Sequence, residues 1–232
     1  MYAFGENGRC TIFLDVVYKS YGRLKMGILN KLFGNTKKPE GFWGKLMVEG
    51  MNRGHAPLAD WGMSFFGDVR PKSILDCGCG GGRNVAELLK RYPQAEVTGL
   101  DYSVVSVKKS EEVNIDAVRN GRCRIVQGDV SALPFADASF DLVSAFETVY
   151  FWPGPDRSFA EVFRVLRTGG VFMVVNEADG KNKADEKWTS IIDGMKIYGK
   201  EELERFLRDA GFTHIETYRN EGKHWLTVRA VK

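Results

Sequence analysis

The stretch ILDCGCGGG, residues 74–82, combines a short apolar run, an acid and a glycine-rich bend. Residues 83–92 follow with apolar side chains at helical spacing, so the sequence predicts a strand that turns directly into a helix. Glycines in such a bend let the backbone approach a ligand closely, and free amides at the start of a helix favour electron-rich groups. The stretch therefore indicates a site for a nucleotide-type cofactor.

A second acid closes the next predicted strand. The run VTGLD, residues 97–101, ends in Asp101, about 19 positions after Gly82. At that spacing an acid is placed to accept hydrogen bonds from ribose hydroxyls. Asp76 stands next to the bend, where its charge would repel a pyrophosphate and favour an ammonium or sulfonium group. The two acids therefore favour a cationic, phosphate-free adenosine ligand over a nicotinamide dinucleotide.

Two later blocks extend this pattern. They are VQGDV, residues 126–130, and the run from LPF, residues 133–135, to SFDLV, residues 139–143. With the glycine bend and its acids, they resemble the class I S-adenosylmethionine-dependent methyltransferases over about residues 73–232. The closest likeness is to the small-molecule enzymes of the ubiquinone and menaquinone biosynthesis type. The resemblance implies an enzyme whose cofactor is S-adenosyl-L-methionine.

The resemblance also implies roles for single residues. In the family, the bend cradles the methionine part of the cofactor, the second acid holds the ribose and an acid after the third strand meets the adenine amino group. We expect the ring of Tyr102 to lie against adenine, although an aromatic after a strand also packs in cores and an Asp there, such as Asp129, also caps turns. The predicted cofactor-binding residues are Asp76, Gly78, Cys79, Gly80, Gly82, Asp101, Tyr102, Asp129, Val130 and Phe146.

Strand and helix patterns alternate along the main body of the chain, as in a doubly wound sheet. We predict strands at 73–76, 96–100, 124–127, 141–146, 170–177, 214–219 and 224–231, and helices at 58–66, 83–92, 104–120, 157–166 and 200–210. The turn between the last two strands is too short for a parallel crossover. The expected fold is α/β, a doubly wound, mostly parallel seven-stranded sheet with an antiparallel C-terminal hairpin, which by resemblance is the Rossmann-like methyltransferase fold.

The chain divides into three predicted parts. Residues 1–40 form an N-terminal leader, residues 41–70 a helical lid, and residues 71–232 the methyltransferase domain. One hypothesis is that residues 1–25 are a start-site artefact, because Met26 looks like a natural start and the Gly-Arg pair at 22–23 can be encoded by a stretch like a ribosome-binding site. The alternative is an amphipathic segment that lies on a membrane or a partner.

Charge, cysteine content and hydropathy restrict the binding partners and the cellular location that we expect. Formal charge is +3, but residues 1–40 hold seven Lys/Arg against three acids, a net of +4 that leaves the remainder near −1. This argues against a nucleic-acid-binding face, which needs clustered cations. The four cysteines form no disulfide framework or zinc motif, and no apolar stretch is long enough to span a bilayer. We therefore expect a soluble cytoplasmic protein; its oligomeric state is left open.

The acceptor side is less defined. Trp43, Met47, Met51 and Trp152 are candidates to line an acceptor pocket, although aromatic and Met residues at helical spacing are also typical of a core. The candidate catalytic residues are His55, Glu147 and Tyr150. His55 is a possible base, but it is equally suited to cap a helix or bind the cofactor carboxylate.

The predicted reaction is in-line methyl transfer to a small molecule. No metal is indicated, because the strand-end acids Asp76, Asp101 and Asp129 are already assigned to the cofactor. The motif Asn-Pro-Pro-aromatic of many base-amino methyltransferases is missing after the fourth predicted strand, which disfavours a nucleic-acid substrate. Two alternatives stay open: a nicotinamide-dependent oxidoreductase and a noncatalytic cofactor-binding module.

Overall fold

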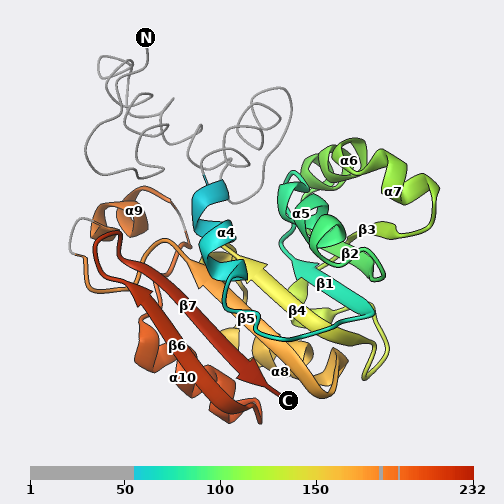
Figure 1. Cartoon of the computed structure of the whole chain (residues 1–232). Helices are drawn as coiled ribbons and strands as arrows, with labels where there is room; N and C mark the ends of the chain where they lie inside the picture. Colours follow the sequence, from blue (N-terminus) through green and yellow to red (C-terminus); the bar gives the residue numbers. More distant parts are fainter. Residues whose placement is uncertain (1–54, 183–184, 193) are drawn as a thin grey trace, which may run out of the picture.

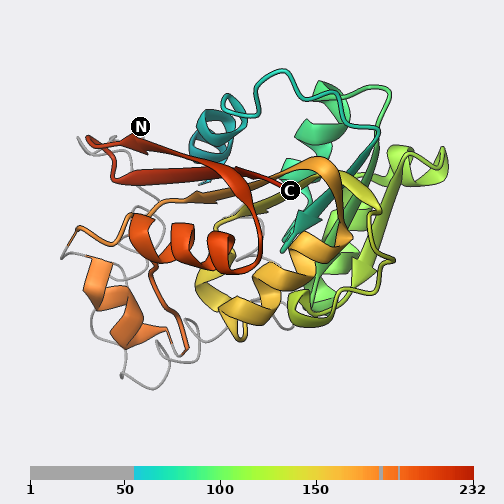
Figure 2. The same ribbon diagram turned by 90° about the horizontal axis from the view of Figure 1, so that it is seen from below.

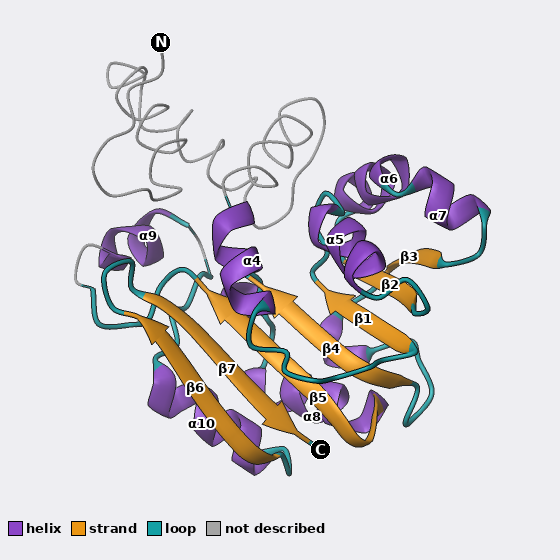
Figure 3. Cartoon of the chain, in the orientation of Figure 1, coloured by secondary structure: helices purple, strands orange, loops and turns teal. Residues whose placement is uncertain are grey.

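The computed structural model describes residues 55–182, 185–192 and 194–232, and a seven-stranded sheet runs through this part of the chain (Figure 1, Figure 3). The strands lie in the order β3-β2-β1-β4-β5-β7-β6. Their bounds are β1 Ser73–Cys77, β2 Glu96–Asp101, β3 Cys123–Gln127, β4 Phe140–Phe146, β5 Leu166–Asn176, β6 Thr213–Asn220 and β7 Trp225–Val231. The order reverses between β1 and β4, which places a crevice at the carboxyl ends of these strands.

The first five strands pair in parallel, whereas β7 is antiparallel to both of its neighbours, β5 and β6. Asn220 lies opposite Trp225 where β6 and β7 meet, and only residues 221–224 connect them. A parallel connection requires a crossover of a dozen or more residues. The predicted doubly wound, mostly parallel sheet with an antiparallel C-terminal hairpin is confirmed.

Helices cover both faces of the sheet (Figure 2). On one face lie α4 Ala56–Met63, α5 Arg83–Arg91, α6 Val104–Val113 and α7 Ile115–Arg119; on the other lie α8 Pro155–Val165 and α10 Lys200–Asp209. The central strands are apolar on both sides because each face is covered. Burial is nearly continuous along β4, for example.

Each face of the sheet has its own apolar core. Between the sheet and α8 and α10, Phe172 packs against Phe159 and Phe212. On the opposite face α4 lies so close to β5 that a Cβ at Gly62 would come within 2.5 Å of the Val175 side chain. This close contact fixes α4 on the sheet, and with it His55 at the residue before the helix.

Three differences between the structure and the predicted elements bear on the sheet and its helices. The helix predicted over 104–120 is two helices, because Asn114 breaks it and its Nδ2 donates to the carbonyl oxygens of Ser110 (2.9 Å) and Gly82 (3.0 Å). β5 begins at Leu166, which pairs with Phe140 across a register shift. A short helix, α9 Glu186–Ile191, was not predicted.

The predicted leader, residues 1–40, lies outside the described residues, as do residues 41–54 of the predicted lid. Of the lid, the structure describes the part from His55 onward, which contains α4. The interpretation of residues 1–25 and the lid itself stay predictions.

Candidate functional site

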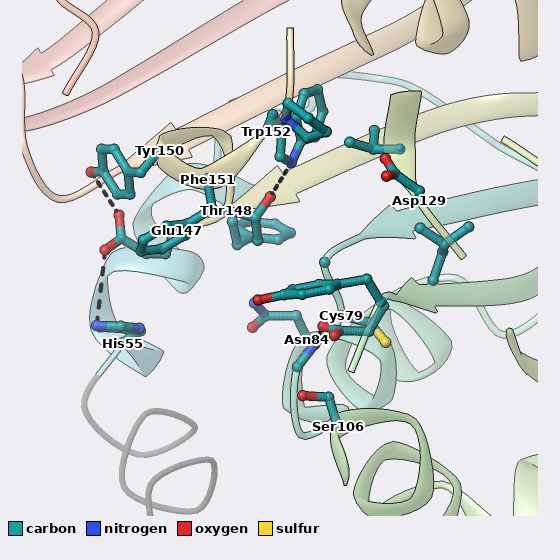
Figure 4. A pocket seen from close by; sticks show the side chains of 18 of the residues that line it. His55, Cys79, Asn84, Ser106, Asp129, Glu147, Thr148, Tyr150, Phe151 and Trp152 are labelled. Carbon is teal, nitrogen blue, oxygen red and sulfur yellow. Dashed lines mark hydrogen bonds and ion pairs between the residues drawn. The ribbon is translucent and has the colours of Figure 1, made fainter. Parts of the chain in front are cut away.

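A cavity of about 530 Å³ lies at the carboxyl ends of the parallel strands, where the strand order reverses. It is lined from the glycine bend after β1, the ends of β2 and β4, the segment after β3 and the start of α4. Figure 4 shows that side chains from these distant segments face one another. The volume falls in the range of small-molecule and cofactor sites.

The glycine bend is tied to the neighbouring strand. The amides of Gly78 and Cys79 both donate to the carbonyl oxygen of Leu100, at 2.7 and 3.0 Å. Gly78 has a φ of +77°, and a Cβ at this residue would collide with Thr148. A Cβ at Gly80, by contrast, would meet no atom within 4 Å, so this residue faces the open cavity. The bend thus brings bare backbone to the ligand space.

Asp101 is held at the end of β2 by two backbone amides. Its Oδ2 accepts from Gly80 and its Oδ1 from Ser103, both at 2.9 Å. Burial raises the pKa of Asp101, while these hydrogen bonds lower it. Asp101 lines the cavity, and hydrogen bonds from the Ser106 side chain and the Tyr102 backbone also lower its pKa. This arrangement suits the predicted contact with ribose hydroxyls.

Asp76 lies behind the bend. It is 1% exposed, is not among the described residues that line the cavity, and accepts a hydrogen bond of 2.8 Å from Ser144 Oγ. Burial raises the pKa of Asp76 to about 7; the Ser144 hydrogen bond opposes this rise and the nearby charge of Asp101 adds to it. Gly82 also lies outside the cavity wall, packed against α6. Direct cofactor contact by these two residues stays a prediction.

Eight of the ten predicted cofactor-binding residues line the cavity, namely Gly78, Cys79, Gly80, Asp101, Tyr102, Asp129, Val130 and Phe146. Asp129 also caps a turn, because its Oδ1 accepts from the amide and the hydroxyl of Ser131, both at 2.8 Å. The turn-capping interpretation is therefore correct, and the residue faces the cavity as well.

The three predicted catalytic residues meet at the other end of the cavity (Figure 4). Glu147 directly follows β4 and has a φ of +61°. Tyr150 donates its hydroxyl to Glu147 Oε1 at 3.2 Å and accepts from the amide of Ala178 at 2.9 Å. The amide of Glu177 donates to the same Oε1. One carboxylate oxygen of Glu147 is thus fixed by two protein groups, the Tyr150 hydroxyl and the Glu177 amide.

His55 faces the second oxygen of Glu147. Its Nε2 lies 3.9 Å from Glu147 Oε2 and 3.9 Å from Glu177 Oε2. Burial lowers the pKa of His55 to about 4, so the imidazole is neutral at pH 7. Burial and the charge of Glu177 hold the pKa of Glu147 well above its usual range. His55 occupies the N-cap position of α4 but makes no side-chain capping bond there.

Glu177 is the member of this group that sequence reasoning missed. It directly follows β5, as Glu147 follows β4. Since parallel neighbours end at the same edge of a sheet, an acid after each of two adjacent strands was the available sequence signal.

The predicted acceptor-lining residues have different outcomes. Trp152 lines the cavity, yet the residue is only 8% exposed and its ring stacks on Phe172 in the core. Its Nε1 donates to Thr148 Oγ1 at 3.0 Å. It therefore serves packing as well as the cavity wall. Phe151 and Tyr198 line the cavity too. Trp43, Met47 and Met51 lie outside the described residues.

The fold and the strand-end cavity define a Rossmann-like cofactor-binding protein, and comparisons with known proteins give its family. Residues 75–174 match the family Methyltransf_11, described as "Methyltransferase domain". Residues 75–174 thus form a methyltransferase domain of the class I S-adenosylmethionine-dependent type, and the cofactor of this class is S-adenosyl-L-methionine.

Two curated relatives from Oryza sativa subsp. japonica illustrate the likeness. Cycloartenol-C-24-methyltransferase 1 is 37% identical over 159 residues, which cover 63% of this chain and 45% of the relative. 2-Methyl-6-phytyl-1,4-hydroquinone methyltransferase 2 is 30% identical over 164 residues, which cover 69% of this chain and 44% of the relative. The chain thus spans less than half the length of these relatives.

A solved structure supports the fold. Phosphoethanolamine N-methyltransferase 2 from Haemonchus contortus, in complex with S-adenosyl-L-methionine, superposes with a TM-score of 0.67 at 17% identity. The superposition covers 77% of this chain and 53% of that chain. Among residues 55–182, 185–192 and 194–232, no helix has both the length and the apolar character needed to cross a membrane.

Proposed function

We propose that the chain transfers a methyl group from S-adenosyl-L-methionine to an apolar or planar small-molecule acceptor by in-line displacement. The observation that carries this proposal is the continuity of the cavity, which runs from the glycine bend and Asp101 to the group formed by His55, Glu147 and Tyr150. A cavity of this size has room for the cofactor and for the part of the acceptor that receives the methyl group.

In this reaction the protein's main task is to position the methyl donor and the acceptor. The acceptor nucleophile attacks the methyl carbon, the carbon–sulfur bond breaks, and its electron pair neutralises the sulfonium to give S-adenosylhomocysteine. Because positive charge on sulfur disappears in this step, a site that excludes water and aligns donor with acceptor accelerates it.

The acceptor class is supported by the wall of the cavity and by the relatives. Tyr150, Phe151 and Trp152 place aromatic side chains on the wall beyond the cofactor half. The two curated relatives are named for cycloartenol and for a phytyl hydroquinone, which are apolar molecules. Trp43, Met47 and Met51 remain predicted additions to this wall.

Glu147 is assigned to the polar end of the acceptor. Its Oε1 is occupied by Tyr150 and the Glu177 amide, whereas its Oε2 is directed toward His55. A raised pKa suits this carboxylate to take a hydrogen bond, and then a proton, from a reacting group. Tyr150 acts as a positioning residue for Glu147 in this assignment.

The net charge and the cysteines support proposals for the class of acceptor and for the cellular compartment. The weak negative net charge beyond residue 40 favours a small-molecule acceptor over a nucleic acid. Cys77, Cys79 and Cys123 are buried free thiols, which suits a reducing compartment such as the cytoplasm.

The test combines binding with turnover. Calorimetric titration should give S-adenosylmethionine binding and no NAD binding; the reverse would favour the oxidoreductase. Labelled methyl donor incubated with a panel of quinols, sterols and fatty acids should then give labelled product. Cofactor binding without product across such a panel would favour the noncatalytic module.

A further inference from the structure

Three side chains that commonly bind metals converge where the acceptor end of the cavity borders α4. Ligand atoms of His55, Glu147 and Glu177 all lie within 4.8 Å of one another. They come from the start of α4, the end of β4 and the end of β5, so elements far apart in the sequence bring them together. The figure of the site shows His55 and Glu147 directed toward each other (Figure 4).

We propose that His55, Glu147 and Glu177 bind one divalent transition-metal ion. The distances from His55 Nε2 to the two carboxylate oxygens, 3.9 Å each, are too long for hydrogen bonds. Two ligand atoms bonded to one ion at about 2.0–2.2 Å lie roughly 3.0–4.3 Å apart, depending on the angle between them. The observed separations fall inside that range.

The carboxylate of Glu147 is already held as a metal ligand would be. Its Oε1 accepts from the Tyr150 hydroxyl and the Glu177 amide, and Tyr150 is itself fixed by the amide of Ala178. This leaves Oε2, the oxygen that faces His55, as the coordinating atom. Ligating carboxylates are commonly oriented by such outer hydrogen bonds.

The electrostatics of the group favour a cation. Ligand oxygens of Glu147 and Glu177 lie within 4.8 Å of each other. Two carboxylates that face each other in a partly buried site repel, and a shared cation removes that repulsion. A neutral imidazole beside them donates a lone pair to a metal ion.

The ligand set selects the kind of ion. One imidazole nitrogen with two carboxylate oxygens suits Zn²⁺ or Mn²⁺, whereas Mg²⁺ and Ca²⁺ prefer oxygen ligands alone. Such an ion would hold an oxygen of the acceptor, in place of a direct hydrogen bond to Glu147. This role rests on the proposed function, whereas binding of the ion does not. The sequence had indicated no metal, because the strand-end acids Asp76, Asp101 and Asp129 were assigned to the cofactor, and Glu177 was not among the acids considered.

The test is calorimetric titration of the chelator-treated full chain with Zn²⁺ and Mn²⁺, with Mg²⁺ for comparison. We expect one ion per chain, with Zn²⁺ bound more tightly than Mg²⁺. His55→Ala, Glu147→Gln and Glu177→Gln should each weaken Zn²⁺ binding by at least about tenfold. His214→Gln and His224→Gln are matched controls and should leave it unchanged; His224 is informative because it also faces a carboxylate, with its Nδ1 3.6 Å from Asp179 Oδ1.

Two results would overturn the proposal: no binding at millimolar Zn²⁺, or binding that survives all three substitutions. Loss of binding in His214→Gln or His224→Gln would likewise place the ion elsewhere. Retained affinity for S-adenosylhomocysteine shows that a variant is folded. Because three ligand residues are substituted separately, the test still holds if one of the variants fails to fold. If the ion binds but methyl transfer persists in excess chelator, the ion has no role in acceptor binding. The proposed methyltransferase function is unaffected by that result.

Discussion

The two ends of the cavity are built in different ways. The proposed cofactor half is lined by the backbone of one continuous bend, residues 78–80, together with Asp101 at the end of the adjacent strand. The proposed acceptor half is lined by His55 and Glu147, with Glu177 beside them, and these three residues are separated by up to 122 positions in the sequence. A short motif specifies the first half, whereas the second exists only once α4, β4 and β5 have come together.

This difference has a functional consequence. Backbone geometry binds the part of the ligand that a whole class of enzymes shares, so it is insensitive to most substitutions outside the glycines. Side chains collected from separate elements change one at a time, so we expect the proposed acceptor half to set substrate choice. The two halves should therefore respond to substitution in separable ways.

The largest expected effect is on turnover. Glu147→Gln should lower the rate of methyl transfer by about 10²–10⁴-fold, because it removes the carboxylate at the reacting end of the acceptor. Affinity for S-adenosylmethionine should stay within about twofold, since the cofactor half is untouched. Steady-state kinetics and calorimetry measure the two quantities. Glu216→Gln, at an exposed acid on β6, is the control. An equal loss of turnover and of cofactor affinity in Glu147→Gln would show that the two halves do not respond separately.

A second prediction concerns the charge buried in the cofactor half. The folded-state pKa of Asp76 is raised to about 7, so ionising this carboxyl opposes folding. The free energy of unfolding should fall as pH rises from about 4 to 7, by an amount on the order of 2–4 kcal/mol, and level off above 7. Asp76→Asn should remove this part of the pH dependence and be the more stable protein at pH 8. Urea unfolding of both proteins without cofactor tests this, and a difference between them that does not vary with pH would refute it.

Next in size is the ribose contact. Asp101→Ala should weaken S-adenosylmethionine binding by about 1–3 kcal/mol, through loss of charged hydrogen bonds to ribose hydroxyls. Calorimetric titration measures the change, with Asp156→Ala, an exposed acid at the start of α8, as the matched variant. An unchanged dissociation constant would remove Asp101 from the cofactor half.

The smallest predicted effect comes from positioning. Tyr150→Phe removes the hydroxyl that donates to Glu147 Oε1, and should lower kcat/KM for the acceptor by about 3–10-fold while cofactor affinity holds. Tyr198→Phe removes a hydroxyl elsewhere on the cavity wall and serves as the control. Equal losses in both variants would argue that Tyr150 does not act through Glu147.

Much of the fold was predictable because its signals are local. The alternation of strands and helices and the four-residue turn before Trp225 are visible in the printed sequence. The break at Asn114 was not, because it depends on a hydrogen bond to Gly82, which is 32 positions away. The early start of β5 at Leu166 likewise depends on pairing with β4.

In the site, too, features with local sequence signals were predictable, and features that depend on distant contacts were not. Asp101 is the last residue of β2 and points into the cavity, but Asp76 comes one residue before the end of β1 and pairs with Ser144 of β4. Asp76 pairs in register with Gly99, so Asp101, two residues further along β2, lies on the same face of the sheet and nearer its carboxyl edge. Position along the strand therefore decides which acid reaches the cavity. Glu177 was missed because its relation to Glu147 requires knowing that β5 lies beside β4.

The central claim is that one cavity holds the cofactor with its reactive sulfur facing the acceptor half. A crystal structure of the chain with S-adenosylhomocysteine tests it most directly. The account predicts the homocysteine part on the bend at Gly78 and Gly80, ribose hydroxyls on Asp101, and the sulfur open toward Glu147. A ligand bound elsewhere, or a sulfur facing away from Glu147, would contradict it.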